Sequence, residues 1–393
     1  MSTVYRVLEA NDLDAYLALE RYAFQVNPDR NKLHQPQMSQ LRGLFAGNQL
    51  LTQLELIPLQ VRTGLGNIRA AGVGSVASDP ATRRQGHVAN LLRHLNDELR
   101  AEGVAFCVLY PFKRSFYGRY GWASFFERRR YSGPPASFAA FAPASGQFVA
   151  VDQSNWAELD RIYQGALRGR FGPIQRDEQW WQQRVLHDFT GQPLYAYIWR
   201  DANGVGRSYT IFALETRGQA RHFVAREMVA LDPEARAQLF AFIAGHEDQV
   251  SLAQFHAPTD APVNLLFPEP LDCAVEPHFM LRLLDLPAAL QAYPFPNELR
   301  GSLTLAVRDD WIAANQGCFT LEFNAGQCAV TPVATANSTD LACDIRTLTQ
   351  LLTRYLRPRT AAAFGLLEVT SRPALALLET AVAGLAPFSS DFF

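Results

Sequence analysis

The sequence predicts an α+β protein of three consecutive domains, on the basis of its length, its composition and the order of its expected strands and helices. A chain of 393 residues is too long for one ordinary core, so two or three domains are expected. Its composition, 48% hydrophobic and 19% charged, is that of a folded globular protein. Strand-like runs alternate with helical periodicity in three blocks, 1–146, 147–277 and 278–393, which we take as the domains.

The first block begins with a strand and a helix. The strand is expected over 4–8, and Asn11-Asp12-Leu13-Asp14 supplies the N-cap that marks the start of the helix. Two apolar, β-branched segments, 49–61 and 70–78, flank a turn at 64–67. These segments predict a meander of strands.

A helix over 85–100 is the most periodic element of this block. Its apolar residues recur on one face of a 3.6-residue period, at Val88, Leu91, Leu92, Leu95 and Leu99. The continuous apolar run 103–110 follows a glycine and predicts a buried strand. The small residues of 136–146, after Pro134 and Pro135, are typical of a linker that closes the block.

The second block repeats this order of elements without visible sequence identity to the first. Its expected elements are a strand over 148–151, a helix from Ser154, a hairpin around Asn203 and Gly204, a strand over 222–231 and a helix over 233–244. The repetition predicts that the two blocks share one architecture.

The third block predicts a further α+β unit. Its expected elements are strands over 281–284, 301–307, 318–323 and 328–332 and helices from Asp285, over 347–355 and over 374–383. The chain then ends in Phe392 and Phe393, whereas frayed tails are usually polar. We therefore expect the tail to be docked in the protein.

Charge and cysteine content exclude several classes of protein. The formal net charge is 36 − 38 = −2, so a chain-wide basic field for nucleic acid or an anionic membrane is not expected. The apolar runs fall far short of the ~18 residues of a membrane span, and the N-terminus lacks the pattern of a secretory signal. The five cysteines form no C-x-x-C pair, which disfavours disulfides and zinc and favours a cytoplasmic protein.

The segment from Val76 to Leu92 carries the strongest chemical signal. A predicted strand ends, a proline follows, and Arg83-Arg84-Gln85-Gly86 leads directly into the helix. The first N–H groups of a helix have no partner within it, and the helix dipole adds positive potential there. Glycine permits close backbone approach and arginine adds charge-assisted contacts, so the segment suits a diphosphate. The alternative is a basic helix start that binds nothing.

Two motifs in the first block resemble those of a known enzyme family. Arg83-x-x-Gly86-x-Val88, with Ala89 next, resembles the R-x-x-G-x-[GA] acetyl-CoA loop of GCN5-related N-acetyltransferases (GNATs), with valine at the last position. The segment from Tyr117 to Trp122 is similar to the Y-G-R-[FY]-G-[YFW] segment of the enhanced intracellular survival (Eis) type. The resemblance covers the whole chain. It implies two tandem GNAT-like domains followed by a domain like sterol carrier protein 2.

The resemblance implies an acetyl-CoA-dependent N-acetyltransferase that acts on a primary amine, aminoglycoside-like, polyamine or lysine, by direct attack in a ternary complex. It implies Tyr117 as general acid, because a phenol with a reference pKa of ~10 is protonated at neutral pH. It implies the C-terminal carboxylate of Phe393 as base, acting through water. It also implies a homo-oligomer, because relatives of this architecture are hexamers.

For acetyl-CoA, the resemblance implies contacts from two segments. The backbone of Val76 and Ser78 would pair with the pantetheine arm like an added strand. The diphosphate would be held by the loop residues Arg83, Arg84, Gly86, Val88 and Ala89. The corresponding helix start of the second block, 230–234, has no glycine and contains two acids that would repel phosphate, so the second block is expected to bind no CoA.

Other residues are weaker candidates. His87 and His94 have no carboxylate at metal-ligand spacing, so no metal is expected. Arg128-Arg129-Arg130 is predicted on a solvated hairpin, and Trp180-Trp181 in a core. Sterol binding by the third block is not favoured, because core packing explains its apolar helices.

The acceptor amine is not specified by the sequence. Acids that line the acceptor pocket of relatives fall in the stretch after Phe24, where this chain reads Gln25-Val26-Asn27-Pro28-Asp29. Tyr110 stands where many relatives have a histidine before proline. Two other functions stay open: a long-chain N-acyltransferase that uses its C-terminal carboxylate, and a non-catalytic acyl-CoA or lipid-binding module.

Overall fold

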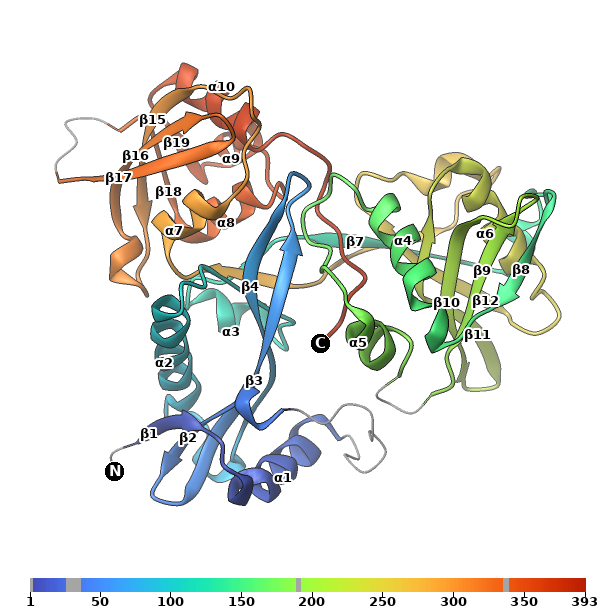
Figure 1. Ribbon diagram of the computed structural model, residues 1–393, viewed down its shortest axis with the longest axis horizontal. Coiled ribbons are helices and arrows are strands. Elements are labelled where there is room, and N and C mark those ends of the chain that lie inside the picture. The colour runs from blue at the N-terminus through green and yellow to red at the C-terminus, as the bar shows by residue number, and fades with distance from the viewer. Residues whose placement is uncertain (1–2, 26–36, 189–191, 335–338) are drawn as a thin grey trace. The chain divides into compact units, whose positions relative to one another are not determined.

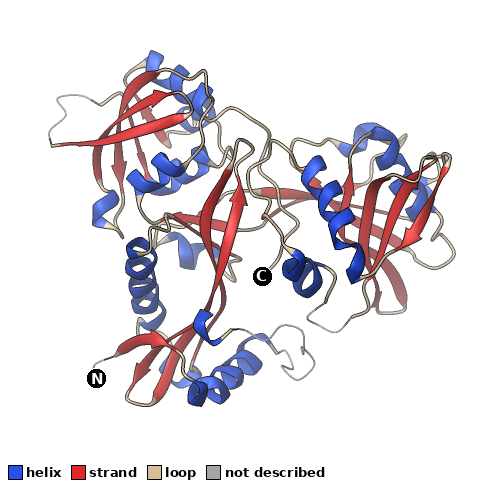
Figure 2. Cartoon of the chain, viewed as in Figure 1, coloured by secondary structure: helices blue, strands red, loops and turns tan. Residues whose placement is uncertain are grey.

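The computed structural model describes residues 3–25, 37–188, 192–334 and 339–393, whose pairing forms three β-sheets (Figures 1 and 2). Contacts divide the chain into two compact units. The first unit comprises Met1–Phe126, His278–Pro387 and Phe393. The second comprises Glu127–Pro277 and Phe388–Phe392. Each unit therefore contains segments that are distant in sequence.

The first sheet belongs to the first unit and contains the segments expected near the N-terminus. Its strands, in spatial order, are β1 (Val4–Val7), β2 (Leu41–Ala46), β3 (Gln49–Arg62), β4 (Asn67–Ser78), β5 (Phe106–Leu109), β14 (Met280–Leu283) and β6 (Ala123–Ser124). Neighbouring strands are antiparallel except β4 and β5, which are parallel. The crossover between β4 and β5 contains helix α2 (His87–Ala101).

Helices cover both faces of this sheet. The leucines of α2 at 91, 92, 95 and 99 are buried against strand residues such as Leu54 and Val73, as the helical period predicts. Helix α1 (Leu13–Phe24) packs on β3 and β4 through Tyr16, whose main-chain carbonyl accepts a hydrogen bond from Gln53. A short helix, α3 (Arg114–Gly118), follows β5.

The second unit has a sheet of the same kind. Its strands, in spatial order, are β13 (Asp272–Pro277), β7 (Glu127–Gly133), β12 (Leu252–Pro258), β11 (Ala220–Ala230), β10 (Gly206–Arg217), β9 (Tyr195–Asp201) and β8 (Gly146–Ala150). Helix α4 (Trp156–Ala166) packs with Ile198, and helix α6 (Pro233–Ala244) packs with Tyr197. Because neighbouring residues of a strand face opposite ways, the two helices cover opposite faces. A short helix, α5 (Glu178–Trp180), lies between α4 and β9.

The third sheet lies in the C-terminal part of the first unit. Its strands, in spatial order, are β17 (Gln327–Val333), β16 (Gly317–Asn324), β15 (Gly301–Arg308), β18 (Leu341–Asp344) and β19 (Leu367–Val369). The helices of this region are α7 (Leu286–Ala292), α8 (Ile345–Leu352), α9 (Pro358–Ala363) and α10 (Arg372–Ala381). The strands and helices expected in the third block are therefore present.

Two strands pair outside the block to which the sequence analysis assigns them. β7 lies in the block predicted as 1–146 but pairs with β12 and β13 in the second sheet. β14 lies in the block predicted as 278–393 but pairs between β5 and β6 in the first sheet. These strands pair with partners that are distant in sequence, and local hydrophobic periodicity contains no information about such partners.

Two local predictions in this region are wrong. Arg128-Arg129-Arg130 lies within β7, which is paired on both sides, and not on a solvated hairpin. Arg130 Nε donates to Glu276 on β13 at 2.5 Å. The stretch 136–146 is not a plain linker, because Phe138 is fully buried in the core of the second unit. Basic side chains can lie along an interior strand when a neighbouring strand supplies acids.

A buried ion pair joins the first sheet to the C-terminal part of the same unit. Arg282 on β14 donates through Nη2 to both oxygens of Asp309, at 2.8 and 2.6 Å. The Arg282 and Asp309 side chains are 0% and 1% exposed. Gly121 makes room for the guanidinium, since a Cβ there would lie 2.6 Å from Arg282 Cζ. The buried guanidinium therefore explains why the Tyr117–Trp122 motif has a glycine at position 121.

We predict that Asp309→Ala lowers the free energy of unfolding by about 3–5 kcal/mol, because it leaves the Arg282 charge buried without its partner. Urea unfolding followed by fluorescence measures the change. The neighbouring Asp310, whose side chain is 84% exposed, supplies the control. Asp310→Ala should change stability by less than about 0.5 kcal/mol. Equal losses in both variants would contradict the role of the pair.

Candidate active site

β4 parts from β5 halfway along its length, and the candidate site lies at this point. The two strands pair only from Ala70 to Val73, opposite Phe106 to Leu109. Over 74–78, no strand of the described residues pairs with β4 on its β5 side. A bulge in the pairing with β3 falls at the same place, and Ser75 has a positive φ of 55°. The parting leaves a backbone edge with which an extended ligand can pair.

The loop after β4 brings positive charge to an uncapped helix start. Gly86 is the N-cap of α2 with φ 83°, and no side chain of the described residues caps the helix there. A Cβ at Gly86 would meet nothing within 4 Å, so the space beside the backbone is open. Arg83 and Arg84 are exposed on the same loop. These features fit an anionic group such as a diphosphate.

The remaining residues predicted to contact acetyl-CoA lie on the two elements that flank this opening. Val76 and Ser78 are half-buried on β4, and the Ser78 hydroxyl donates to Thr52 Oγ1 at 3.1 Å. Val88 and Ala89, in the first turn of α2, pack against the core of the sheet. Packing therefore fixes both segments, while their binding roles stay predictions.

Tyr117 is buried among aromatic rings just after β5. Its ring is 2% exposed and lies with its centroid 5.5 Å from that of Phe112 and 6.1 Å from that of Trp122. Burial, with a smaller contribution from Tyr120, raises the pKa of the Tyr117 phenol well above its usual value. Tyr117 is therefore protonated at neutral pH, as a proton donor must be.

The tail is docked, and its last residue lies on β4. The Phe393 ring stacks on Phe279 with centroids 4.8 Å apart. A Cβ on Gly72 would lie 2.8 Å from the Phe393 ring, and a Cβ on Gly74 would lie 4.0 Å from its main-chain carboxyl carbon. Glycines 72 and 74 lie on one face of the strand, so their lack of side chains admits both the ring and the carboxyl group.

Two further carboxylates gather beside Gly74. Glu55 on β3 is 3% exposed, and its Oε2 lies 3.7 Å from the point that a Gly74 Cβ would occupy. Glu20 on α1 accepts hydrogen bonds from the Ser75 side chain and from Gln53 Nε2, the latter at 3.3 Å. Burial raises the pKa of Glu20 to about 7, and the charge of Glu55 adds to this effect against the two hydrogen bonds.

The sequence analysis missed Glu20, Glu55 and the glycine pair. A signal was available, because Gly72 and Gly74 alternate within a strand and Gln53 and Glu55 interrupt an apolar one. Val26–Asp29, in the stretch where relatives carry acceptor-lining acids, lies outside the described residues. The ring of Tyr110, which stands where relatives have histidine, lies 5.2 Å from that of His278.

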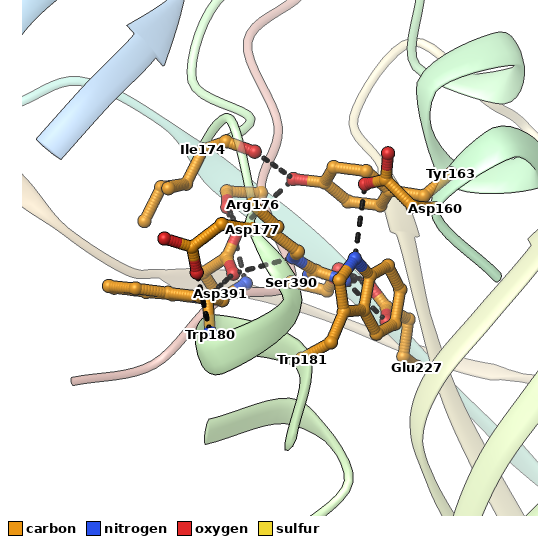
Figure 3. Close-up of polar contacts among 11 residues, drawn as sticks. Asp160, Tyr163, Ile174, Arg176, Asp177, Trp180, Trp181, Glu227, Ser390 and Asp391 are labelled. Carbon is orange, nitrogen blue, oxygen red and sulfur yellow. Dashed lines mark hydrogen bonds and ion pairs between the residues drawn. The ribbon is translucent and has the colours of Figure 1, made fainter. Parts of the chain in front are cut away.

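In the second unit, a buried charge cluster holds the preceding tail residues (Figure 3). Arg176 donates through Nε to Asp391 at 2.9 Å and through Nη2 to Glu227 at 2.8 Å. All three side chains are at most 4% exposed. Tyr163 and Trp180 also donate to Asp391, at 3.1 and 3.0 Å. One buried cation cannot balance two acids, so the hydrogen bonds from Tyr163 and Trp180 help to stabilise the Asp391 carboxylate. These hydrogen bonds and the ion pairs together hold the tail in place.

The helix that corresponds to α2 in the second unit has a closed N-terminus. The Asp232 side chain caps α6 by accepting a hydrogen bond from the Ala235 N–H at 2.9 Å, and Pro233 follows the cap. Arg207 pairs with both Asp232 and Glu234. The N–H groups and charge that would bind phosphate are therefore already used.

The two tryptophans predicted in a core have different outcomes. Trp181 is fully buried in a core, as predicted, whereas Trp180 is half-buried against the tail. Across the described part of the chain, no three His, Cys, Asp or Glu side chains gather as a metal site would require. No helix in that part combines the length and apolar character of a membrane span.

Known protein families match three parts of the chain. The acetyltransferase (GNAT) domain matches residues 4–125, and a second acetyltransferase (GNAT) domain family matches 172–283. The chain is a GNAT acetyltransferase. A sterol carrier protein domain matches residues 286–390 of this enzyme, so the predicted fold class of two tandem GNAT domains and a sterol-carrier-like domain is confirmed. GNAT domains use acetyl-CoA.

Similar proteins agree with this assignment. An uncharacterized N-acetyltransferase of Streptomyces coelicolor is 24% identical over 326 residues, which are 80% of this chain and 78% of the relative. A GCN5-related N-acetyltransferase from Anabaena variabilis has the same fold, with a TM-score of 0.89 and 24% identity over 100% of both chains. Eis1 from Mycobacterium abscessus also shares it, with a TM-score of 0.78 and 20% identity over 100% of both chains.

We predict that Gly86→Val weakens acetyl-CoA binding at least about tenfold, because the side chain would fill the space beside the helix N–H groups. Calorimetric titration with acetyl-CoA measures the affinity. Gly47 is a matched control, because it also has positive φ, 57°, and a Cβ there would also meet nothing within 4 Å. Gly47→Val carries the same backbone strain and should bind acetyl-CoA normally; equal weakening would contradict the site.

Proposed function

We propose that this GNAT enzyme transfers the acetyl group of acetyl-CoA to a primary amine, of an aminoglycoside-like molecule, a polyamine or a lysine side chain. The observation that carries the proposal is the gathering of the Phe393 carboxyl group and Glu55 at Gly74, beside Glu20, where β4 parts from β5. Carboxylates attract a cationic ammonium and can accept its protons. The thioester and the amine would meet at this parting.

In the proposed reaction, the amine nitrogen attacks the thioester carbonyl carbon within one ternary complex. A C–N bond forms and the C–S bond breaks. With Phe393 as the last residue of the chain, its carboxylate accepts, through water, the proton that frees the nitrogen lone pair. Tyr117 donates a proton to the departing sulfur and is reprotonated by the second proton from nitrogen. The products are an amide, CoA thiol and one released proton.

Acceptor recognition would rest on Glu20 and Glu55. The ammonium group would lie between these acids and the Phe393 carboxyl group, where its charge would favour the ionised form of Glu20, whose pKa is raised by burial and, less strongly, by the charge of Glu55. Gln53 adds an acceptor, because its Oε1 is buried without a hydrogen-bond partner in the described part of the chain. The second GNAT domain would bind no CoA, and the enzyme would act in the cytoplasm as a homo-oligomer.

The test of this function is acetyl-CoA turnover with a panel of polyamines, aminoglycosides and lysine peptides. The proposal predicts release of CoA thiol that depends on the amine. Long-chain acyl-CoA in place of acetyl-CoA tests the rival acyltransferase. Binding of acyl-CoA without turnover of any amine would favour the non-catalytic alternative and contradict the proposal.

We predict that Tyr117→Phe lowers kcat by ~10²–10⁴-fold, the usual contribution of a general acid, and leaves acetyl-CoA affinity near wild type. Steady-state kinetics and calorimetry separate the two effects. Tyr120→Phe is the matched control, since Tyr120 is a buried tyrosine three residues away, 9% exposed. Normal turnover by the Tyr117→Phe enzyme would assign Tyr117 to packing alone.

The Phe393 carboxylate can be separated from its ring by three variants. Deletion of Phe393 and addition of a short Gly-Ser tail both move the charge, and each should lower kcat at least about tenfold. Phe393→Leu keeps the carboxylate on a smaller side chain and should lose less activity. Melting temperature and acetyl-CoA affinity should stay near wild type in all three. Full activity of the extended enzyme would exclude the carboxylate as base.

We predict that Glu20→Gln raises KM for the amine about tenfold with little change in KM for acetyl-CoA, because one acceptor-binding charge is lost. In the wild type, KM for the amine should fall as pH rises through about 7, since Glu20 ionises there. The variant should lose this inflection. Asp14→Asn, an exposed acid on the same helix, is the control. An unchanged pH profile in Glu20→Gln would remove Glu20 from the site.

A further inference from the structure

The second unit keeps the strand geometry that forms the acetyl-CoA opening in the first. Its parallel strands β11 and β12 pair only from His222 to Val224, opposite Leu252 to Gln254. Beyond this point β11 continues to Ala230 and β12 to Pro258, paired with β10 and β7 respectively. A bulge at Arg226 interrupts the pairing of β11 with β10, as the bulge near Ser75 does in β4. The second unit therefore has a parting of its own.

A cavity of about 170 Å³ lies at this parting. Its walls come from the separated halves of β11 and β12, from α4 and α6, and from the tail. Most lining residues are apolar, among them Ala166, Phe255 and Phe388. An apolar cavity of about 150 Å³ engineered into another protein binds benzene, so this one has room for a six- to eight-atom apolar group.

The rim of the cavity favours an anion but not a diphosphate. Its charged side chains include three arginines, at 170, 226 and 236, and one acid, Glu227, which pairs with Arg176, a cation that it shares with Asp391. Arg170 pairs with Asp260 and Arg226 with Asp188, while Arg236 is exposed and has no ion pair among the described residues. The capped start of α6 offers no N–H groups to phosphate. A single carboxylate matches this rim better than CoA does.

We propose that this cavity is a binding site for a small apolar carboxylate of about the size of hexanoate, with its chain in the cavity and its carboxylate at Arg236. The tail takes part in the site, because Phe388 and Ser390 line it. The Ser390 hydroxyl donates to Glu227, which belongs to the cluster that holds Asp391. Occupation of the cavity therefore stabilises the docked tail. The proposal is independent of the acetyl acceptor.

Calorimetric titration of the full chain with sodium hexanoate tests the site, with hexylamine as a probe of equal chain length and opposite charge. We expect saturable binding of one hexanoate per chain and at least tenfold weaker binding of hexylamine. Arg236→Ala should weaken hexanoate binding about tenfold, the loss of one charge-assisted contact. Arg168→Ala, which removes an exposed arginine outside the cavity, is its control.

Two further measurements locate the ligand. Ala166→Phe should fill the cavity and abolish binding, whereas Ala157→Phe, at an exposed position of the same helix, should bind normally. Melting temperatures show whether both variants fold, and if Ala166→Phe does not, the exposed Arg236 variant carries the test. Hydrogen exchange at 388–390 should slow when hexanoate is bound. No binding, equal binding of hexylamine, or binding unaffected by Arg236→Ala would overturn the proposal.

Discussion

The parting of β4 from β5 is the constraint on which the rest of the first unit depends. Parallel strands normally satisfy each other's backbone groups, so a strand that continues beyond its partner keeps an open edge. The crossover helix α2 starts at the same end, and Gly86 leaves its first N–H groups uncapped. The bulge near Ser75 and the glycines at 72 and 74 then clear the strand face for the tail. In our proposal, acetyl-CoA binds the backbone groups that this sheet leaves unsatisfied.

The two units share their strand geometry and differ at the start of one helix. Both have a parted pair of parallel strands and a bulge, but among the described residues no side chain caps the start of α2, whereas Asp232 caps the start of α6. Asp232 and Pro233 close the second helix start, and Arg207 pairs with Asp232 and Glu234 there. A few residues at the helix start therefore decide whether the parting can take a diphosphate, while the cavity behind it persists. The same architecture thus serves two different kinds of ligand in our proposals.

Much of the fold was predictable from the sequence, because its elements have strong local signals. The leucines of α2, the turn between β3 and β4 and the glycine-led strand β5 are all placed correctly by periodicity and turn residues. The pairing of β7 and β14 outside their expected blocks was not predictable, because strand partners that are distant in sequence leave no local pattern. The helix-start motif was recognisable because its chemistry is contiguous. Glu20 and Glu55 were missed because only tertiary packing brings α1 and β3 together at Gly74.

Hydrogen exchange with and without acetyl-CoA tests the central claim most directly, because the claim concerns individual backbone amides. If the parted edge and the α2 start bind acetyl-CoA, exchange should slow at amides within 75–78 and 86–90. The corresponding amides of the second unit, within 225–236, should be unchanged because Asp232 closes α6. Protection in the second unit, or none at 86–90 under saturating acetyl-CoA, would contradict the account.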